Sequence, residues 1–394
     1  MKEFYVPSSK SITNRLLIIR YLSQSVEPII NASQAQDSLL LKDILGNIDS
    51  NQDTFFCNNA GTSTRFVTAL LALKKGLWHL DASQRMKQRP LEPLISALQM
   101  LGAKIQTSNN TFPLTIEGGF LHGDKTLSVD SRLSSQFLSS LLLIAPCVKG
   151  GLTFLLSKNT SSIAYVELTL WLMQQCGAKI KREQNKIIVA EGKYIFHSMQ
   201  VENDWASALF ACEQIAIQKR GEVLIKNLSL NSHQPERRAL QYFSLFGVEA
   251  LQNEKDIVIS YNPQKDIANQ KSTNKVIQIE LTNCIDSFAP LAASALFCGC
   301  KVVFKGIEPL KHKESNRIVA MQEGLQSLKA TTFVSKDSFV INGFSDIKEN
   351  ITIRTFADHR IAMTFYILGL RINGLKIDDK VCIAKSFPSF FSNF

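Results

Sequence analysis

A short pattern that recurs along the chain constrains the fold more than any other sequence feature. The segment Leu101–Ile105 (LGAKI) returns as Cys176–Ile180 (CGAKI), and weaker copies are Phe246–Ala250 and Leu328–Thr332. In the first two copies an amphipathic helical pattern precedes the segment, and a strand, a polar turn and a second strand follow it. Leu45–Gly46 is a candidate fifth copy. A unit of roughly 70 residues that holds helices and strands together predicts an α/β domain built from stacked copies.

The glycine of each full copy has an expected structural role. It stands directly after the helical pattern, where a left-handed backbone conformation ends a helix and glycine adopts it without steric cost. We therefore expect Gly102, Gly177 and Gly247 to end helices. The second strands expected after the copies are Leu114–Gly118, Ile187–Gly192, Ile257–Ile259 and Phe339–Gly343.

Length and charge limit the organisation of the chain and its partners. With 394 residues it is long enough for two domains and a large core. Its formal net charge of +10 suits an anionic partner. The sequence has no basic block of five or more residues and no alternation of aromatic and basic residues. The positive charge is therefore placed residue by residue, and we expect no binding to nucleic acid.

Cysteine usage and hydropathy indicate a cytoplasmic protein. The eight cysteines are scattered in apolar surroundings, and Cys298-Gly299-Cys300 is the only close pair, without a second pair at zinc-site spacing. Free thiols in a reducing compartment are the expected state. The opening Met1–Tyr5 has no apolar core of a signal peptide, and the apolar run near Leu141 to Val148 is too short to span a bilayer.

A strand followed by a small polar turn that opens a helix is the first candidate binding element. Thr54–Cys57 has the composition of a strand, and the polar stretch Asn58–Arg65 follows it. Apolar residues at positions 66, 69, 70 and 73 then mark one face of a helix. The free N–H groups of a helix start and its dipole favour an anion. One such stretch alone is more often an ordinary capped helix.

Similar polar helix starts recur, and most carry cations. Hydroxyls, free N–H groups and two cations of Pro7–Arg15 form a plausible anion cradle. The planar guanidinium of arginine binds two oxygens of a carboxylate or phosphate at once, so the arginine-rich segments are candidate binding sites for such anions. The further segments are Arg85–Pro90, Asp130–Gln136, Ser161–Tyr165, Ile285–Phe288, Lys311–Arg317, Phe356–Arg360 and Lys385–Pro388.

Seven of these segments, in this order, resemble the motifs of the 5-enolpyruvylshikimate-3-phosphate synthase family, also called 3-phosphoshikimate 1-carboxyvinyltransferase. The resemblance runs nearly end to end, and no single motif carries it. The motifs are Ser9–Ser11 through Arg15, Asn59–Thr62, Arg85–Pro90, Ser134–Gln136, Lys313–Arg317, Asp358–Arg360 and Ala384–Pro388.

The resemblance implies an α/β (α+β) fold with the two-domain enolpyruvyl transferase architecture. Each domain would hold three βαβαββ-type repeats related by pseudo-threefold symmetry, in agreement with the repeats above. The first, inserted domain would comprise residues 8–201, and the second, discontinuous domain residues 1–7 plus 202–394. The chain would then cross between the domains twice, so two segments would form the hinge, and the active site would lie in the interdomain cleft.

The implied reaction moves the carboxyvinyl group of phosphoenolpyruvate to the 5-hydroxyl of shikimate 3-phosphate and releases phosphate. The path is addition–elimination through a tetrahedral intermediate. Such a transferase belongs to the shikimate pathway of aromatic amino acid and chorismate biosynthesis. The resemblance implies a monomer that needs no cofactor and no metal, acts on these two small molecules and associates with no membrane.

The resemblance also implies a role for individual residues. The catalytic residues would be Asp286, Glu314 and Lys10. Shikimate 3-phosphate would be bound by Lys10, Ser11, Arg15, Ser134, Ser135, Gln136, Ser162, Tyr165, Asp286 and Lys313. Phosphoenolpyruvate would be bound by Lys10, Gly61, Thr62, Arg89, Gln136, Arg317, His359, Arg360 and Lys385.

Electrostatics agree with that reaction. Two phosphates and two carboxylates would meet in one cleft, and bringing such charges together at low dielectric costs several kcal/mol per pair, by an order-of-magnitude estimate, unless cations balance them. The motifs supply nine cations: Lys10, Arg15, Arg65, Arg85, Arg89, Lys313, Arg317, Arg360 and Lys385.

Several positions depart from the family pattern and leave affinity and hinge geometry open. They are Ser8, Ile163, Ala164, Asn203, Ala206, Pro309 and Asn316. Two alternatives remain. One is the related transferase acting on UDP-N-acetylglucosamine, which typically carries a cysteine before the arginine-rich motif, whereas the loop Trp78–Arg89 has none. The other is a non-catalytic protein that binds anions or nucleic acid.

Overall fold

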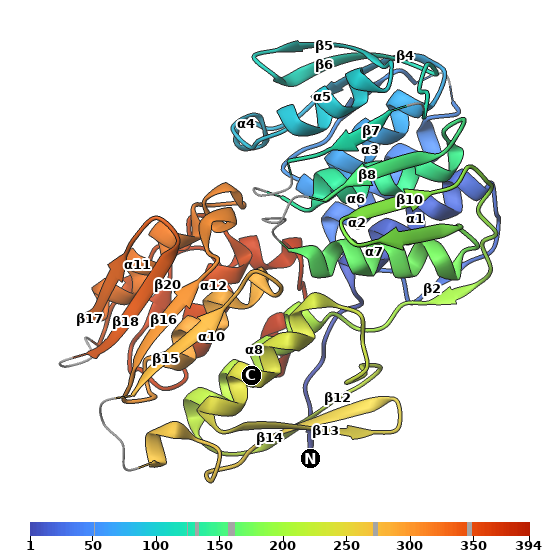
Figure 1. The fold of residues 1–394 in the computed structure, drawn as a ribbon. Coiled ribbons are helices and arrows are strands. Elements are labelled where there is room, and N and C mark those ends of the chain that lie inside the picture. The colour runs from blue at the N-terminus through green and yellow to red at the C-terminus, as the bar shows by residue number, and fades with distance from the viewer. Residues whose placement is uncertain (51, 124, 131–133, 157–161, 271–274, 345–348) are drawn as a thin grey trace. The chain divides into compact units, whose positions relative to one another are not determined.

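The computed structural model divides the chain into two compact units (Figure 1). It describes residues 1–394 except 51, 124, 131–133, 157–161, 271–274 and 345–348. The inserted unit is Ser8–Val201, and the discontinuous unit joins Met1–Pro7 to Glu202–Phe394. These bounds coincide with the two domains expected from the sequence.

One sheet pattern occurs four times among the described residues, twice in each unit. The first two strands of each sheet are parallel, and the third and fourth join by antiparallel pairing. In the inserted unit the strand order of the first sheet is β3 (Thr54–Phe56), β4 (Gly76–Asp81), β6 (Thr111–Gly118) and β5 (Lys104–Ser108). The order of the second sheet is β7 (Thr126–Ser128), β8 (Leu152–Leu155), β10 (Lys186–Val189) and β9 (Ile180–Glu183). In the discontinuous unit one sheet has the order β1 (Lys2–Glu3), β12 (Glu222–Ile225), β14 (Asp256–Tyr261) and β13 (Val248–Asn253). The other has the order β15 (Val276–Glu280), β16 (Lys301–Lys305), β18 (Ser338–Phe344) and β17 (Ala330–Val334).

A two-stranded parallel sheet accompanies the larger sheets in each unit. In the inserted unit β2 (Ile29–Ile30) pairs with β11 (Met199–Gln200). In the discontinuous unit β19 (Thr352–Ile353) pairs with β20 (Lys376–Ile377).

The repeated sequence segments lie at the same place in the four larger sheets. Each leads into an outer strand: β5, β9, β13 or β17. Gly102, Gly177 and Gly247 have φ angles of 107°, 84° and 80°, so the expected left-handed helix ends are confirmed. In the degenerate copy Lys329 takes this role with φ 62°. The fifth candidate is wrong, because Gly46 lies in the last turn of α2 (Gln36–Asn47) without a left-handed backbone, and the helix ends at a right-handed Ile48.

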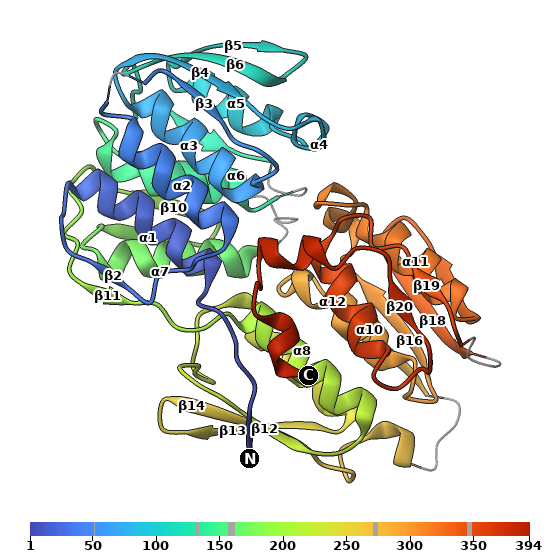
Figure 2. The ribbon, with the colours of Figure 1, turned by 180° about the vertical axis from the view of Figure 1, so that it is seen from behind.

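Helices occupy the middle of the inserted unit, between its sheets (Figures 1 and 2). Its buried centre includes the Phe137–Ile144 stretch of α6 and Leu16–Ile19 of α1, whose side chains pack into one hydrophobic cluster. The helices are α1 (Lys10–Ser23), α2, α3 (Gly61–Leu73), α4 (Gln84–Lys87), α5 (Glu92–Met100), α6 (Gln136–Ile144) and α7 (Ile163–Gln175).

The discontinuous unit is also built around helices. Trp205 is fully buried at the start of α8, and its indole Nε1 donates to the Ser229 carbonyl at 3.1 Å. Edge-to-face contacts of Phe288 with Phe304 and Phe339 join α10 to its sheet. The helices are α8 (Trp205–Gln218), α9 (Leu240–Phe243), α10 (Phe288–Ala295), α11 (Arg317–Ser327) and α12 (His359–Leu368).

Both ends of the chain meet in the discontinuous unit. Strand β1 pairs in parallel with β12, placing Lys2 opposite Val223. The buried Asn393 side chain accepts from the Tyr5 N–H at 2.7 Å and donates to the Tyr5 carbonyl at 3.1 Å. The first residues therefore belong structurally to the second half of the sequence.

The state of the cysteines and the character of the helices can be read directly from the structure. All eight cysteines have free thiols, and six of them are buried. Within the described residues, none of the helices combines the length and the apolar character that crossing a bilayer requires.

Candidate functional site

Three cations surround the Asp286 carboxylate in the discontinuous unit. Its Oδ1 lies 3.0 Å from Lys313 Nζ and 2.9 Å from Arg317 Nη1. Arg360 Nη2 lies 3.6 Å from Oδ2. Asp286 sits in a 3₁₀ turn, Ile285–Ser287, that runs directly into α10. Arg317 and Arg360 stand at the starts of α11 and α12. The turn and two helix starts thus bring together residues that are far apart in the sequence.

A second carboxylate fixes the orientation of Arg317. Asp358 is fully buried and accepts from Arg317 Nε at 2.8 Å and from Nη2 at 3.2 Å. The same carboxylate accepts from the Ser315 hydroxyl at 3.0 Å and caps α12 through the Arg360 N–H at 3.0 Å. This two-point contact holds the guanidinium plane in one direction.

Glu314 links two further motifs to this group. Its Oε2 lies 2.9 Å from His359 Nδ1, and its Oε1 lies 3.1 Å from Lys385 Nζ. The His359 side chain is 3% exposed, whereas that of Glu314 is 13% exposed. The site residues expected on this unit thus form two adjoining groups of contacts, one around Asp286 and one around Glu314. Atoms of Glu314, Asp358 and His359 lie within 4.8 Å of one another, and we call the two groups together the acidic–basic cluster. It comprises Asp286, Lys313, Glu314, Arg317, Asp358, His359, Arg360 and Lys385.

Charge and burial act in opposite directions on the acids of this cluster. Burial alone would raise the pKa of Asp286, but the charges of Lys313, Arg360 and Arg317 outweigh it and hold the pKa well below its usual range. Burial lowers the pKa of His359 despite the nearby Glu314. The imidazole is therefore neutral near pH 7 and donates its Nδ1 proton to Glu314.

Carboxylate and imidazole atoms of Glu314, Asp358 and His359 lie within 4.8 Å of one another, a separation that a metal ion could bridge. Two cations already hold these acids, because Arg317 contacts Asp358 and Lys385 contacts Glu314. The positive charge beside the donor atoms disfavours a bound divalent cation. The arrangement suits organic anions better than a metal.

Lys10 and Arg15 lie on the first turns of α1 in the inserted unit. Ser9 caps this helix by accepting from the Ile12 N–H. Lys10 Nζ lies 2.9 Å from Asp37 Oδ2. Arg15 is 2% exposed; its Nη1 donates to the Ser11 carbonyl at 2.9 Å, and Nη2 to the Tyr165 carbonyl at 3.3 Å. The Ser11, Arg15 and Tyr165 expected to bind one substrate are thus neighbours.

The Gly61 turn forms a second group on the inserted unit. Gly61 begins α3, and a Cβ there would lie 2.5 Å from Arg89 Nη1, so only glycine lets this guanidinium approach the turn. Arg65 donates to the Gly61 carbonyl and to Gln136 Oε1, both at 2.9 Å. Gln136 Nε2 in turn donates to Thr62 Oγ1 at 2.8 Å.

Two expected hydroxyl positions lie at helix starts. Ser135 precedes α6, and Ser162 precedes α7 with a left-handed backbone, φ 57°. Ser134 Oγ accepts from the Gln136 N–H at 3.2 Å. Positions 131–133 and 161 of these expected helix starts lie outside the described residues.

Three residues to which the motifs assign no substrate organise these groups. Asp37 holds Lys10, and Asp358 holds Arg317. Arg65 is one of the nine motif cations but belongs to neither set of expected substrate contacts, and in the structure it positions Gln136. Asp358 lies in the Asp-His-Arg motif and was therefore within reach of the sequence. Asp37 had no signal, because its partner is close only in space.

Asn316, one of the departures from the family pattern, has a visible function. It caps α11 by accepting from the Val319 N–H at 3.4 Å. Asparagine and aspartate are about equally good helix N-caps, so this change preserves the start of the helix that carries Arg317.

Fold and clusters together define an α/β enzyme class that handles small organic anions with arginine, lysine and paired carboxylates. A family profile, EPSP synthase (3-phosphoshikimate 1-carboxyvinyltransferase), matches residues 45–394. The chain belongs to this family.

Relatives and solved structures agree with that membership. A 3-phosphoshikimate 1-carboxyvinyltransferase of Syntrophobacter fumaroxidans is 32% identical over 99% of this chain and 95% of its own length. One of Dehalococcoides mccartyi is 30% identical over 98% and 94%. The EPSP synthase structure from Acinetobacter baumannii matches with a TM-score of 0.77 at 22% identity, covering 100% of this chain and 94% of that one. The expected enolpyruvyl transferase family and its α/β fold are confirmed.

Proposed function

We propose that this chain transfers the carboxyvinyl group of phosphoenolpyruvate to the 5-hydroxyl of shikimate 3-phosphate, releasing phosphate. Membership of a family of 3-phosphoshikimate 1-carboxyvinyltransferases supports the reaction. The acidic–basic cluster is the observation that carries it, because it joins proton-transferring carboxylates to cations that suit phosphate and carboxylate.

The substrate contacts of this proposal follow the motif positions. Lys10 and Gln136 would contact both substrates. Shikimate 3-phosphate would also contact Ser11, Arg15, Ser134, Ser135, Ser162, Tyr165, Asp286 and Lys313. Phosphoenolpyruvate would also contact Gly61, Thr62, Arg89, Arg317, His359, Arg360 and Lys385. The neighbouring positions of Ser11, Arg15 and Tyr165, and of Gly61 and Arg89, support the two sets. The proposal requires both units to act on the same pair of substrates.

In the proposed mechanism the substrates compete with carboxylates of the site for the same cations. Lys313 and Arg317 bind Asp286, and Lys385 binds Glu314. Substrate phosphate and carboxylate groups would take over these cations and thereby release the acids. The pKa of Asp286 would then rise from its depressed value, which makes this carboxylate a better proton acceptor.

Proton transfer then requires one donor and one acceptor. The methylene carbon of phosphoenolpyruvate gains a proton as the 5-hydroxyl attacks the adjacent carbon and loses its own proton. In the elimination the new methyl group loses a proton while the carbon–oxygen bond to phosphate breaks, which restores the alkene and releases phosphate. Glu314 and Asp286, with Lys10 assisting, are the groups proposed for these transfers. Neutral His359 keeps Glu314 oriented through the 2.9 Å contact.

Phosphate release from phosphoenolpyruvate that depends on shikimate 3-phosphate tests the proposal. Glu314→Gln should lower kcat by at least about 100-fold, because it removes a proton-transfer group while keeping its shape. Glu323→Gln, an exposed change on α11, is the matched control and should keep full activity.

Three outcomes contradict the proposal. Normal turnover of Glu314→Gln would remove its assigned role. Phosphate release with UDP-N-acetylglucosamine but not with shikimate 3-phosphate would favour the related transferase, and release with neither acceptor would favour a non-catalytic anion binder.

A further inference from the structure

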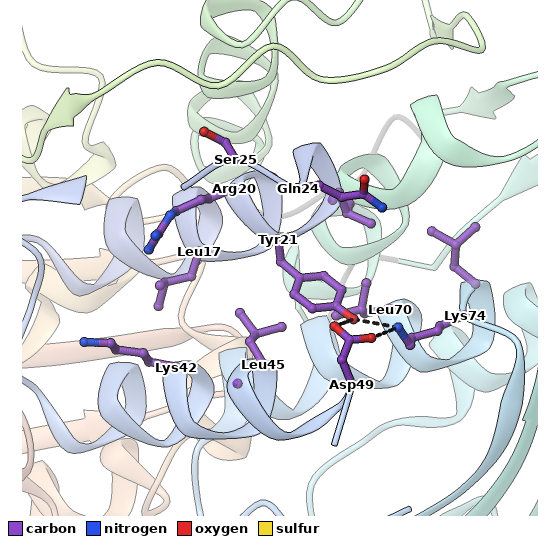
Figure 3. Close-up of a pocket in the computed structure, with 13 residues that line it drawn as sticks. Leu17, Arg20, Tyr21, Gln24, Ser25, Lys42, Leu45, Asp49, Leu70 and Lys74 are labelled. Atoms are coloured by element: carbon purple, nitrogen blue, oxygen red, sulfur yellow. Dashed lines mark hydrogen bonds and ion pairs between the residues drawn. The ribbon is translucent and has the colours of Figure 1, made fainter. Parts of the chain in front are cut away.

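A pocket of about 770 Å³ lies in the inserted unit, away from the residues assigned to substrates (Figure 3). The last turns of α1, the second half of α2 and the end of α3 line it. The proposed substrate-binding residues Lys10 and Gly61 lie instead at the first turns of α1 and α3. The volume is within the usual range of small-molecule sites, about 300–1,000 Å³.

The floor of this pocket is apolar. Leu17, Leu45 and Leu70 come from the three different helices, and Figure 3 shows Leu17 and Leu45 facing each other beside the Tyr21 ring. Leucine side chains offer a ligand no hydrogen bond, so only a molecule with an apolar body would gain from contact with them. A fully polar anion would not use this surface.

The rim of the pocket carries excess positive charge. Three of the lining residues are cations, Arg20, Lys42 and Lys74, whereas Asp49 is the one acid among the lining residues. Lys74 pairs with Asp49, and the Tyr21 hydroxyl donates to Asp49 Oδ2 at 3.0 Å. With this pair neutralised, Arg20 and Lys42 remain to attract an anion.

Arg20 has unused hydrogen-bonding capacity. Its Nη2 donates to the Val26 carbonyl at 3.2 Å. Its Nε is buried and has no hydrogen-bond partner in the part of the chain that the structure describes. The accessible edge of the guanidinium, at its Nη atoms, keeps N–H donors beyond the Val26 contact, and a carboxylate oxygen at the rim can accept from them.

From these features we propose that the pocket binds an amphipathic organic anion, a carboxylate on a compact apolar or aromatic body. The body packs against the leucine floor beside Tyr21. The carboxylate lies at the rim and accepts from Arg20, with Lys42 contributing long-range attraction. Nothing in this site depends on the reaction proposed above.

Gly46 offers a direct way to close the pocket. It lies on α2 among the lining residues, and a Cβ built there has no atom within 4 Å. Gly46→Phe therefore places a ring in open space, and Gly46→Ala is the matched control that changes the helix backbone in the same way without filling the pocket. Both changes favour the helix.

The experiment is calorimetric titration of the full chain with 2-naphthoate, and with neutral 2-naphthamide as the uncharged partner. We expect 2-naphthoate to bind wild type and Gly46→Ala with similar Kd and to lose detectable binding to Gly46→Phe. Arg20→Gln should weaken binding about tenfold or more, as loss of a charged hydrogen bond predicts. Lys75→Gln, a charge change at an exposed neighbour outside the pocket, should leave Kd unchanged.

Circular dichroism and the thermal midpoint establish that each variant is folded. Undiminished binding of 2-naphthoate to folded Gly46→Phe would overturn the proposal, because the ligand would then lie elsewhere. Equal affinity for 2-naphthamide and 2-naphthoate would also overturn it, since the charge would play no part. Absence of any binding to wild type would do the same.

Discussion

Buried acids in this protein stand in two opposite environments. Asp286 and Asp358 face arginine or lysine, which hold their pKa values low. Glu213 on α8 is fully buried, and neither of its carboxylate oxygens has a hydrogen-bond partner of good geometry among the described residues. Burial raises the pKa of Glu213 well above its usual range, although Thr364 opposes this. The Glu213 side chain is therefore protonated in the folded state.

This raised pKa predicts a pH-dependent stability. The folded state keeps the Glu213 proton while the unfolded chain releases it above roughly pH 4.3. The contribution of Glu213 to the free energy of unfolding is therefore fully present below that pH. It is lost as the pH rises through the raised pKa of the folded state. Glu213→Gln should thus gain stability relative to wild type between pH 5.5 and pH 8, measured by urea unfolding at both values.

The exposed Glu222→Gln on β12 is the control for this comparison. Its free energy of unfolding should differ from that of wild type by the same small amount at both pH values. If the difference in unfolding free energy between Glu213→Gln and wild type were the same at both pH values, the buried carboxyl would titrate alike in the folded and unfolded states.

Arg89 provides a prediction about geometry rather than charge. Its guanidinium lies against the Gly61 turn at a distance that excludes any side chain there. Lysine keeps the charge but lacks the planar fork that binds two oxygens. Arg89→Lys should therefore raise KM for phosphoenolpyruvate about tenfold with a smaller change in kcat, measured by steady-state phosphate release.

Arg182→Lys, on an exposed ion pair with Glu167, is the matched substitution. It should leave both kinetic constants unchanged. An unaltered KM in Arg89→Lys would argue against its contact with phosphoenolpyruvate.

At the scale of elements, two glycines associated with helices predict opposite effects. Gly46 lies inside α2 with free space around it, so Gly46→Ala should stabilise the fold by up to about 1 kcal/mol. Gly102 has φ 107°, and a Cβ there would lie 2.6 Å from the Phe120 carbonyl oxygen. Gly102→Ala should therefore destabilise by more than about 1 kcal/mol.

Urea unfolding of both alanine variants checks this pair. The same sign of change in both would show that the helix-end conformation of Gly102 does not determine its effect. The comparison also separates the true repeat position from the position that resembled it only in sequence.

Elements were predictable where local pattern and local chemistry agree. The Gly102 segment combined a helical apolar pattern with a glycine stop, and the structure has that helix end and its following outer strand. The pair Leu45–Gly46 had the same letters, but α2 ends one residue later, at Asn47, and its C-cap Ile48 keeps a right-handed backbone. A glycine alone does not end a helix.

The candidate site was predictable only in part, for a physical reason. Motif cations such as Arg317 and Arg360 were visible because their residue types and spacing suit anions. Their partners depend on folding: Asp37 reaches Lys10, and Gln136 reaches Arg65, across many intervening residues. The sequence pattern describes neighbours along a helix, whereas these pairs join separate helices and turns.

At the scale of the whole molecule, the excess positive charge bears on substrate capture. The chain carries a net charge of +10, and both proposed substrates are polyanions. Salt screens such long-range attraction over about 8 Å at physiological ionic strength. We expect kcat/KM for phosphoenolpyruvate to fall severalfold between about 50 and 300 mM potassium chloride, measured at constant pH.

A neutral osmolyte at matched osmolarity serves as the control for this effect and should not lower kcat/KM. If kcat/KM were independent of salt, the net charge would serve another purpose than attracting substrates.

The positions of the tryptophans give the two units separate optical signals. Of the three tryptophans, Trp78 and Trp171 belong to the inserted unit, and Trp205 alone belongs to the discontinuous unit. Because Trp205 is fully buried, its emission will shift to the red when α8 becomes hydrated. A chain in which the other two are replaced by phenylalanine would thus report, in one fluorescence spectrum, on the half of the protein that carries Asp286 and Glu314.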